Sequence, residues 1–176
     1  MHIKIGANLT MGCDLTYVGI PGEVRRDAFH GTTLQSALGI LQDGFRLAIG
    51  IAGMGCYFDL GNDASARERA LLRANGNSSK ATIIQAELHL GKTLDINFKT
   101  NPAIRGNFKL WQKRRKIQLA KKNFEEQKEL FLSELYPLVN SVLYPSLRTS
   151  NLYVAVRDPK RIKILSDQTL DGKVIK

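Results

Sequence analysis

The spacing of apolar residues predicts one helix early in the chain. Leucine, isoleucine and alanine recur every three or four positions between residues 34 and 41, which is the period of one helix face. Thr32 or Thr33 is suited to the N-cap, and Gly44 is suited to the position after the last turn. The turn-rich residues 19–27 ahead of this helix are expected to form a connector.

Alternation and glycine content predict the neighbouring elements. Residues 82–90 alternate between apolar and polar side chains and predict a strand. The segment 63–74 predicts a second helix with an alanine-rich apolar face. Glycines interrupt the apolar run 46–60, which predicts a flexible loop leading into a strand over 55–58. One or two short strands are also expected within residues 3–18.

The second half of the chain predicts a helical segment and then strands. Within the long segment that starts at residue 97, residues 108–139 favour helix, either as one long helix or as two. The runs 150–158 and 161–165 predict strands, and the chain after Asp167 is expected to be loose. Strands before and after a helical segment predict an α+β fold, because a regular β-α-β alternation is missing.

The composition indicates the number of domains and the net charge of the chain. The 176 residues are 43% hydrophobic, which is enough for one domain spanning residues 1–176. The chain has 26 Lys and Arg against 16 Asp and Glu, and its net charge is therefore +10. Such a charge favours a polyanionic partner, although simple solubility or an acidic protein partner explains it as well.

The cysteines and the N-terminal sequence indicate in which cellular compartment the protein is expected. Cys13 and Cys56 show neither metal-ligand spacing nor a disulfide framework, so we expect no metal and a reducing environment. Residues 1–19 lack the apolar core of a secretory signal, and no apolar run approaches the length of a membrane span. The expectation is a cytoplasmic protein with no membrane partner.

The stretch Ala28–Thr33, with the sequence AFHGTT, carries the candidate chemistry. A glycine at a strand end lets a ligand amide approach the backbone, and the imidazole of His30 can hydrogen-bond a sugar hydroxyl. Tyr57 follows the glycine-rich run and can stack on a flat heterocycle. Ser65 opens the second helix and can donate a further hydrogen bond. A carboxamide, a flat ring and ribose hydroxyls together describe the nicotinamide end of NAD.

Three stretches in this order carry a family resemblance: FHGTTLQSALGILQDGFRLA, GMGCYFDLGNDASARERA and ATIIQAELHLGK. They resemble the catalytic domain of the poly(ADP-ribose) polymerase-like, diphtheria-toxin-type ADP-ribosyltransferases. The match covers roughly residues 29–92 and, more weakly, LYVAVRDPKRIKIL at residues 152–165. The resemblance implies a split β-sandwich of two small sheets flanked by helices. A basic helical insert at about residues 100–140 would interrupt it.

The resemblance implies that NAD is the substrate and is held by six residues: His30, Gly31, Thr32, Arg46, Tyr57 and Ser65. His30 would bond the 2′-hydroxyl of the adenine-side ribose. The Gly31 backbone and the Ser65 hydroxyl would hold the carboxamide, and Tyr57 would stack on the nicotinamide ring. Arg46 would lie near the adenine and the pyrophosphate, where a guanidinium suits phosphate.

The catalytic set implied by the resemblance is His30, Tyr57 and Tyr153. Tyr153 stands where polymerising members of the family carry a glutamate, and the pattern is therefore similar to that of mono-ADP-ribosyltransferases or of an inactive member. Glu68 occupies the position of a second stacking tyrosine. Glu68, Glu87 and Glu134 are unranked candidates for an assisting carboxylate.

Each of these residues also has a structural interpretation. Tyr57 and Tyr153 alone would most often be packing residues on strands. Ser65 is also suited to cap a helix, and Arg46 is also compatible with a purely solvent-exposed role. His30 alone would most often be structural.

Seven cations and no acid lie between residues 109 and 122, and this run predicts a surface for nucleic acid. The candidate contacts are Lys109, Lys113, Arg114, Arg115 and Lys116, with Trp111 stacking on a base. The alternative is a solvated helix face without a partner.

The sequence thus predicts an NAD-dependent mono-ADP-ribosyltransferase that modifies nucleic acid. A protein acceptor, an NAD glycohydrolase and a catalytically silent module that binds nucleic acid or ADP-ribose remain alternatives. The small size and the family habit also suggest a bacterial or phage toxin held by an acidic antitoxin.

Overall fold

The computed structural model describes residues 23–99, 101–145 and 152–175, and the strands predicted within residues 3–18 lie outside these ranges. The α+β class is confirmed, because one eight-stranded sheet is combined with helices. The strands are β1 (Val24–Thr33), β2 (Ala48–Gly50), β3 (Gly53–Leu60), β4 (Ala81–His89), β5 (Thr93–Asp95), β6 (Ser141–Pro145), β7 (Leu152–Val156) and β8 (Ile162–Thr169). The α-helices are α1 (Leu34–Asp43), α2 (Ala64–Arg73), α3 (Pro102–Arg114), α4 (Lys116–Leu119) and α5 (Phe124–Leu135).

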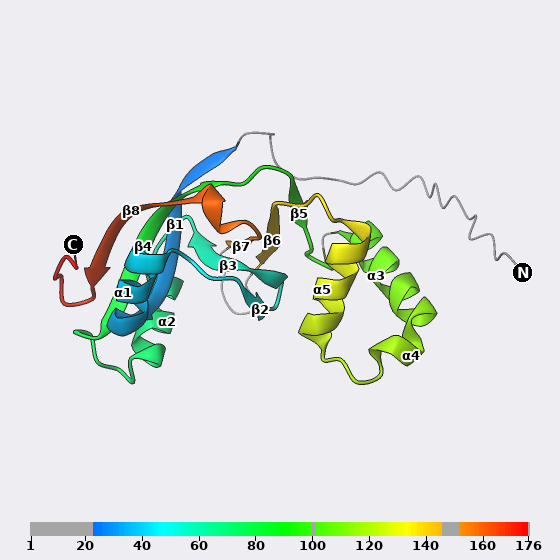
Figure 1. The fold of residues 1–176 in the computed structure, drawn as a ribbon, viewed down its shortest axis with the longest axis horizontal. Coiled ribbons are helices and arrows are strands. Elements are labelled where there is room, and N and C mark those ends of the chain that lie inside the picture. The colour runs from blue at the N-terminus through cyan, green and yellow to red at the C-terminus, as the bar shows by residue number, and fades with distance from the viewer. Residues whose placement is uncertain (1–22, 100, 146–151, 176) are drawn as a thin grey trace, which may run out of the picture.

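The sheet has two halves that meet at a short junction. Its strand order is β5-β6-β7-β3-β1-β4-β8, and β2 pairs with β3 as a hairpin. Strands β1 and β4 pair from Val24 to Thr33, whereas β1 and β3 pair only through Ala28 with Leu60 and Phe29 with Asp59. Beyond these two pairs the halves diverge, which gives the predicted split, although the two halves remain hydrogen-bonded as one sheet (Figure 1).

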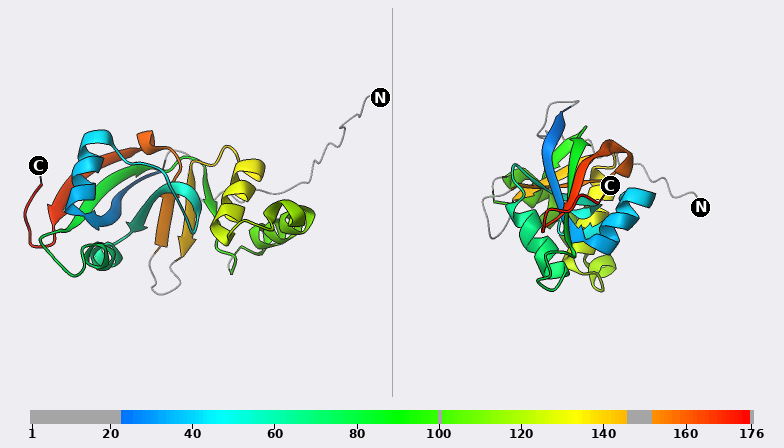
Figure 2. Two further views of the ribbon diagram at one scale, coloured as in Figure 1. Left: turned by 60° about the horizontal axis from the view of Figure 1, so that its bottom comes forward. Right: turned by 90° about the vertical axis from the view of Figure 1, so that its left-hand side faces the viewer.

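Helices α1 and α2 cover opposite faces of the β1–β4–β8 half (Figure 2). Helix α1 begins as predicted, because the Thr33 hydroxyl accepts a hydrogen bond from the Ser36 amide at 3.3 Å. It ends at Gly44, whose φ of 81° favours glycine. Helix α2 turns its small residues Ala66 and Ala70 inward, so its backbone can approach β1 closely.

The helical insert forms a small bundle at the other end of the sheet (Figure 1). It contains three helices where the sequence predicted one or two. The break before α5 follows from capping, because Asn123 forms a capping box with Glu126, and Asn101 caps the start of α3. Aromatic residues, among them Phe108 and Phe131, pack the bundle core.

Some predicted loops are strands. Residues 24–27 belong to β1, since long-range pairing with β4 outweighs their turn-rich composition. Residues 48–50 pair with β3 instead of forming a flexible loop. The chain after Asp167 is ordered by hydrogen bonds, including one from the Ile175 amide to the Asp167 carboxylate at 3.1 Å.

None of the helices in the described ranges is both long and apolar enough to cross a membrane.

Candidate active site

A small cavity of about 160 Å³ lies where the two halves of the sheet separate. Four predicted site residues line it, namely His30 and Gly31 from β1, Tyr57 from β3 and Tyr153 from β7. The other lining residues are Phe58, Arg69, Arg73 and Tyr144. Tertiary structure therefore brings four strands, β1, β3, β6 and β7, together with α2 around one space lined by aromatic and cationic side chains.

A larger cleft of about 410 Å³ opens on the α1 side. Thr32, Arg46 and the C-terminal end of α1 line it, together with His30 and Tyr57. These last two residues line both spaces, which makes them the boundary between the cavity and the cleft. The arrangement suits a ligand with two parts.

His30 bridges the halves of the sheet. Its Nδ1 lies 2.8 Å from the carbonyl oxygen of Tyr57, and a carbonyl only accepts, so Nδ1 carries the proton and donates. Burial lowers the pKa of His30 to about 4, and the nearby Arg73 and Arg69 lower it further against the opposing effect of the Tyr57 carbonyl. The neutral ring at pH 7 leaves Nε2 as an acceptor for a hydroxyl.

Tyr57 is held by the turn between β2 and β3. Its hydroxyl accepts a hydrogen bond from the Ala52 amide at 3.2 Å and donates one to the Gly53 carbonyl. Burial raises the pKa of Tyr57 to about 12, so the hydroxyl stays protonated at pH 7. The ring lies 6.1 Å from that of Tyr144, measured between centroids, in an edge-on geometry.

Gly31 packs against α2 so tightly that a side chain at this position would overlap the Ala66 carbonyl oxygen. The Gly31 carbonyl accepts a hydrogen bond from Nη1 of Arg73 at 2.6 Å. A carbonyl oxygen has two lone pairs, so a carboxamide would share this acceptor with Arg73 or displace the arginine.

The corner around Tyr153 is cationic. Arg69 lies over the Tyr153 ring, 4.8 Å from its centroid, and forms an ion pair with the fully buried Asp59. Tyr144 stacks on Tyr153 with centroids 5.2 Å apart. The Arg69 guanidinium therefore lies beside Tyr153, the position at which the family resemblance leads one to expect a carboxylate.

The remaining predicted NAD contacts differ in their placement. Thr32 is buried, whereas Arg46 is exposed at the rim of the cleft and pairs with Asp43 at 2.9 Å. Ser65 is buried near the start of α2 and is not among the residues that line the cavity or the cleft.

The three candidate carboxylates lie away from the cavity lining. Glu87 binds Arg26 and His89 on the β4 surface, and Glu134 accepts from Trp111 within the insert. Glu68 is exposed on α2. Among the described residues that line the small cavity, none is an aspartate or a glutamate.

Trp111 is buried in the core of the insert, with 6% exposure, and its indole donates to Glu134 at 2.9 Å. The predicted stacking of Trp111 on a base is therefore wrong, because the ring is buried and packs against Phe108 and Phe131. Arg115 also pairs with Glu134. The exposed cations are Lys109, Lys113, Arg114 and Lys116.

Sequence reasoning missed four residues of this site: Asp59, Arg69, Arg73 and Tyr144. The signal for the arginines was present, because Arg69 and Arg73 are four residues apart and share one face of α2. Asp59 and Tyr144 carried no such signal, since only the pairing of β3, β7 and β6 brings them together.

Comparison with models of known protein families and with curated proteins gives no match. Among solved structures, the chain is similar to one from the M. tuberculosis MbcT–MbcA toxin–antitoxin complex. The TM-score is 0.45 at 12% identity, and the alignment covers 85% of each chain. A likeness at this level says nothing about the activity of this chain.

Proposed function

We propose that this protein is an NAD-dependent mono-ADP-ribosyltransferase. The observation that carries the proposal is the convergence of His30, Gly31, Tyr57 and Tyr153 on one cavity, next to a cleft lined by Thr32 and Arg46. Positions 30, 57 and 153 lie far apart in the sequence, and their meeting is what the family pattern requires.

The cavity and the cleft share His30 and Tyr57 as lining residues, and in this proposal each takes one half of NAD. The nicotinamide would occupy the aromatic cavity, against Tyr57 and beside the Gly31 backbone. The adenosine half would occupy the cleft, with Arg46 at its rim. His30 lies between the two spaces, and its neutral Nε2 would accept a hydrogen bond from a ribose hydroxyl.

Transfer breaks the bond between C1′ of the ribose and the pyridinium nitrogen. The electron pair stays with the nitrogen, and nicotinamide leaves as a neutral molecule. A nucleophile of the acceptor then forms its bond to C1′ and releases its proton to the bulk solvent. The aromatic rings that line the cavity would hold the leaving group in place.

The test is incubation with NAD labelled in the adenine half, followed by separate nuclease and protease digestion of the product. Label that nuclease removes supports transfer to nucleic acid, and label that protease removes supports a protein acceptor. Free ADP-ribose without a labelled polymer would support a glycohydrolase and contradict transfer.

A catalytically silent binding module is the second candidate. It is favoured by Arg73, which lines the cavity and bonds the Gly31 carbonyl, because a nearby cation opposes a developing positive charge. Arg69 also lines the cavity, but it is paired with Asp59. NAD that binds in calorimetry without release of nicotinamide would establish this alternative.

Nucleic acid remains the favoured acceptor because the exposed cations of α3 and α4 form a basic surface without an acidic residue between Lys109 and Lys116. The toxin role, an acidic antitoxin and a cytoplasmic location remain predictions from the sequence.

A further inference from the structure

The helical insert contacts the candidate site through the turn between β2 and β3. The Nζ of Lys128 on α5 donates a hydrogen bond to the Ile51 carbonyl in this turn. The neighbouring Glu129 accepts a hydrogen bond from the Met54 amide, with its Oε2 2.5 Å from the nitrogen. Two consecutive side chains of α5 therefore hold both ends of one short segment.

The same turn encloses the hydroxyl end of Tyr57. The Ala52 amide and the Gly53 carbonyl, which lie between the two contacts of α5, bond this hydroxyl from both sides. A Cβ at Gly50 would lie 2.8 Å from the Tyr57 hydroxyl oxygen, so only glycine fits without a shift of the ring. The position of Tyr57 thus depends on the position of the turn.

Both α5 side chains are themselves anchored. Arg157, directly after β7, binds Glu129 with two hydrogen bonds of 2.9 and 2.7 Å. Lys128 is 5% exposed, and its ammonium lies 4.7 Å from the centroid of the Phe124 ring. Burial lowers the pKa of Lys128 to about 8, so the contact with Ile51 is made against a desolvation cost. An apolar residue would pack at this position without that cost.

We infer that Lys128 and Glu129 are positioning residues for Tyr57, so that the helical insert sets the geometry of the cavity in which nicotinamide would bind. The expected effect on catalysis rests on the proposed function. The coupling of α5 to the Tyr57 ring does not, because it is a property of the fold.

The first test observes Tyr57 without any substrate. The measurement is an NMR spectrum of protein with ¹³C-labelled tyrosines. The ring signals of Tyr57 are identified by their absence from the spectrum of Tyr57→Phe. We expect Glu129→Gln and Lys128→Met to shift these signals, whereas Lys128→Arg, which keeps a donor, retains the wild-type signals. Leu130→Gln, directly after Glu129 on α5 with an exposed side chain, is the matched control and should leave them in place.

Unchanged Tyr57 signals in folded Glu129→Gln and Lys128→Met would overturn the inference. This readout does not depend on NAD turnover, so it stands even if the wild type releases no nicotinamide, a result that would count against the proposed function alone.

The second test is a double-mutant cycle on nicotinamide release. Lys128→Met is expected to lower kcat on the order of tenfold or more, because a misplaced ring loses its alignment with the leaving group. In the Tyr57→Phe background, which has already lost the hydroxyl held by the turn, the same change should lower kcat by less than about twofold. Equal effects of Lys128→Met in both backgrounds would contradict the coupling through Tyr57.

Discussion

At the scale of single residues, the His30 side chain on β1 makes a hydrogen bond to β3 that a backbone amide would make in a regular strand pair. The pairing of β1 with β3 stops after Phe29 and Asp59, and the next contact between these strands is His30 Nδ1 with the Tyr57 carbonyl. Because the side chain is longer than a backbone amide, the halves separate while remaining connected, and a cavity opens between them.

Removal of this imidazole should impair NAD cleavage. His30→Ala loses the ring that bridges the strands and the acceptor for the ribose hydroxyl. We expect a loss of roughly 1–3 kcal/mol in transition-state stabilisation, which corresponds to about fivefold to about 150-fold in kcat/KM for nicotinamide release. His89→Ala on the exposed end of β4 is the control and should retain wild-type rates. A wild-type rate in His30→Ala would remove this residue from the site.

His30 should also make stability depend on pH. Its pKa is about 4 in the folded chain against an ordinary value of 6.5, so between these values the unfolded chain binds a proton that the folded chain does not. The free energy of unfolding should therefore fall as the pH drops through this window, by up to about 1.4 kcal/mol per pH unit.

Urea unfolding of wild type and of His30→Gln between about pH 7 and about pH 4.5 checks this prediction, since glutamine does not titrate. The difference in stability between the two proteins should shrink or reverse as the pH falls. A difference that is constant across the range would show that His30 titrates normally.

At the scale of elements, the close approach of α2 to β1 depends on one glycine. Gly31 lies directly under the Ala66 carbonyl, and this contact allows Arg73 to reach the Gly31 carbonyl. The position of α2 places the two arginines of the cavity, so the spacing between β1 and α2 decides which groups line this space.

Gly31→Ala should force α2 away from β1. Overlap with backbone atoms cannot be relieved by a rotamer change, and we expect destabilisation of about 1–3 kcal/mol in denaturant unfolding. Gly39→Ala in α1 is the matched control, because a Cβ there meets nothing within 4 Å and should stabilise the helix by up to about 1 kcal/mol. The same stability change in both variants would contradict the packing described for Gly31.

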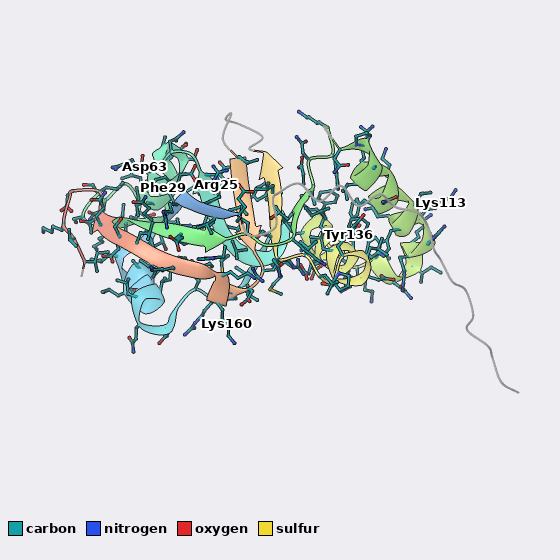
Figure 3. All side chains as sticks on the ribbon, turned by 90° about the horizontal axis from the view of Figure 1, so that it is seen from above. Arg25, Phe29, Asp63, Lys113, Tyr136 and Lys160 are labelled. Atoms are coloured by element: carbon teal, nitrogen blue, oxygen red, sulfur yellow. The ribbon has the colours of Figure 1, made fainter. Side chains whose placement is uncertain are left out.

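At the scale of the whole molecule, the basic surface and the candidate site lie apart. Lys113 lies at the opposite end of the molecule from Phe29 on β1 and Asp63 beside α2 (Figure 3). Helix α5 lies between α3 and the sheet (Figure 1). An acceptor held on the basic surface would therefore need to extend to reach the cavity.

Charge reversal on this surface should separate NAD cleavage from acceptor modification. Changing Lys109, Lys113, Arg114 and Lys116 to glutamate spares Arg115, whose pairing with Glu134 is part of the insert. We expect nicotinamide release within about twofold of wild type and a large loss of label on nucleic acid, together with a flatter salt dependence of binding. Undiminished labelling of nucleic acid by this variant would rule out the basic surface as the acceptor site.

The sequence by itself determined the local elements and the members of the site motif. Periodicity and capping residues predicted α1, α2, β4 and β7 close to their observed bounds, because these depend on neighbouring residues. The candidate motif at His30, Gly31 and Tyr57 was proposed from short stretches of sequence and their family resemblance, and its role in binding stays a prediction.

Only tertiary structure decided what surrounds that motif. Residues 24–27 and 48–50 lie in strands that pair with other segments of the chain. Trp111 is buried in the aromatic core of the insert and does not lie on the predicted nucleic-acid surface. Asp59, Arg69 and Tyr153 meet through strand pairing and helix packing, over separations that periodicity does not report. Contacts between distant segments depend on the register and spacing of the sheet, and these are properties of the assembled chain.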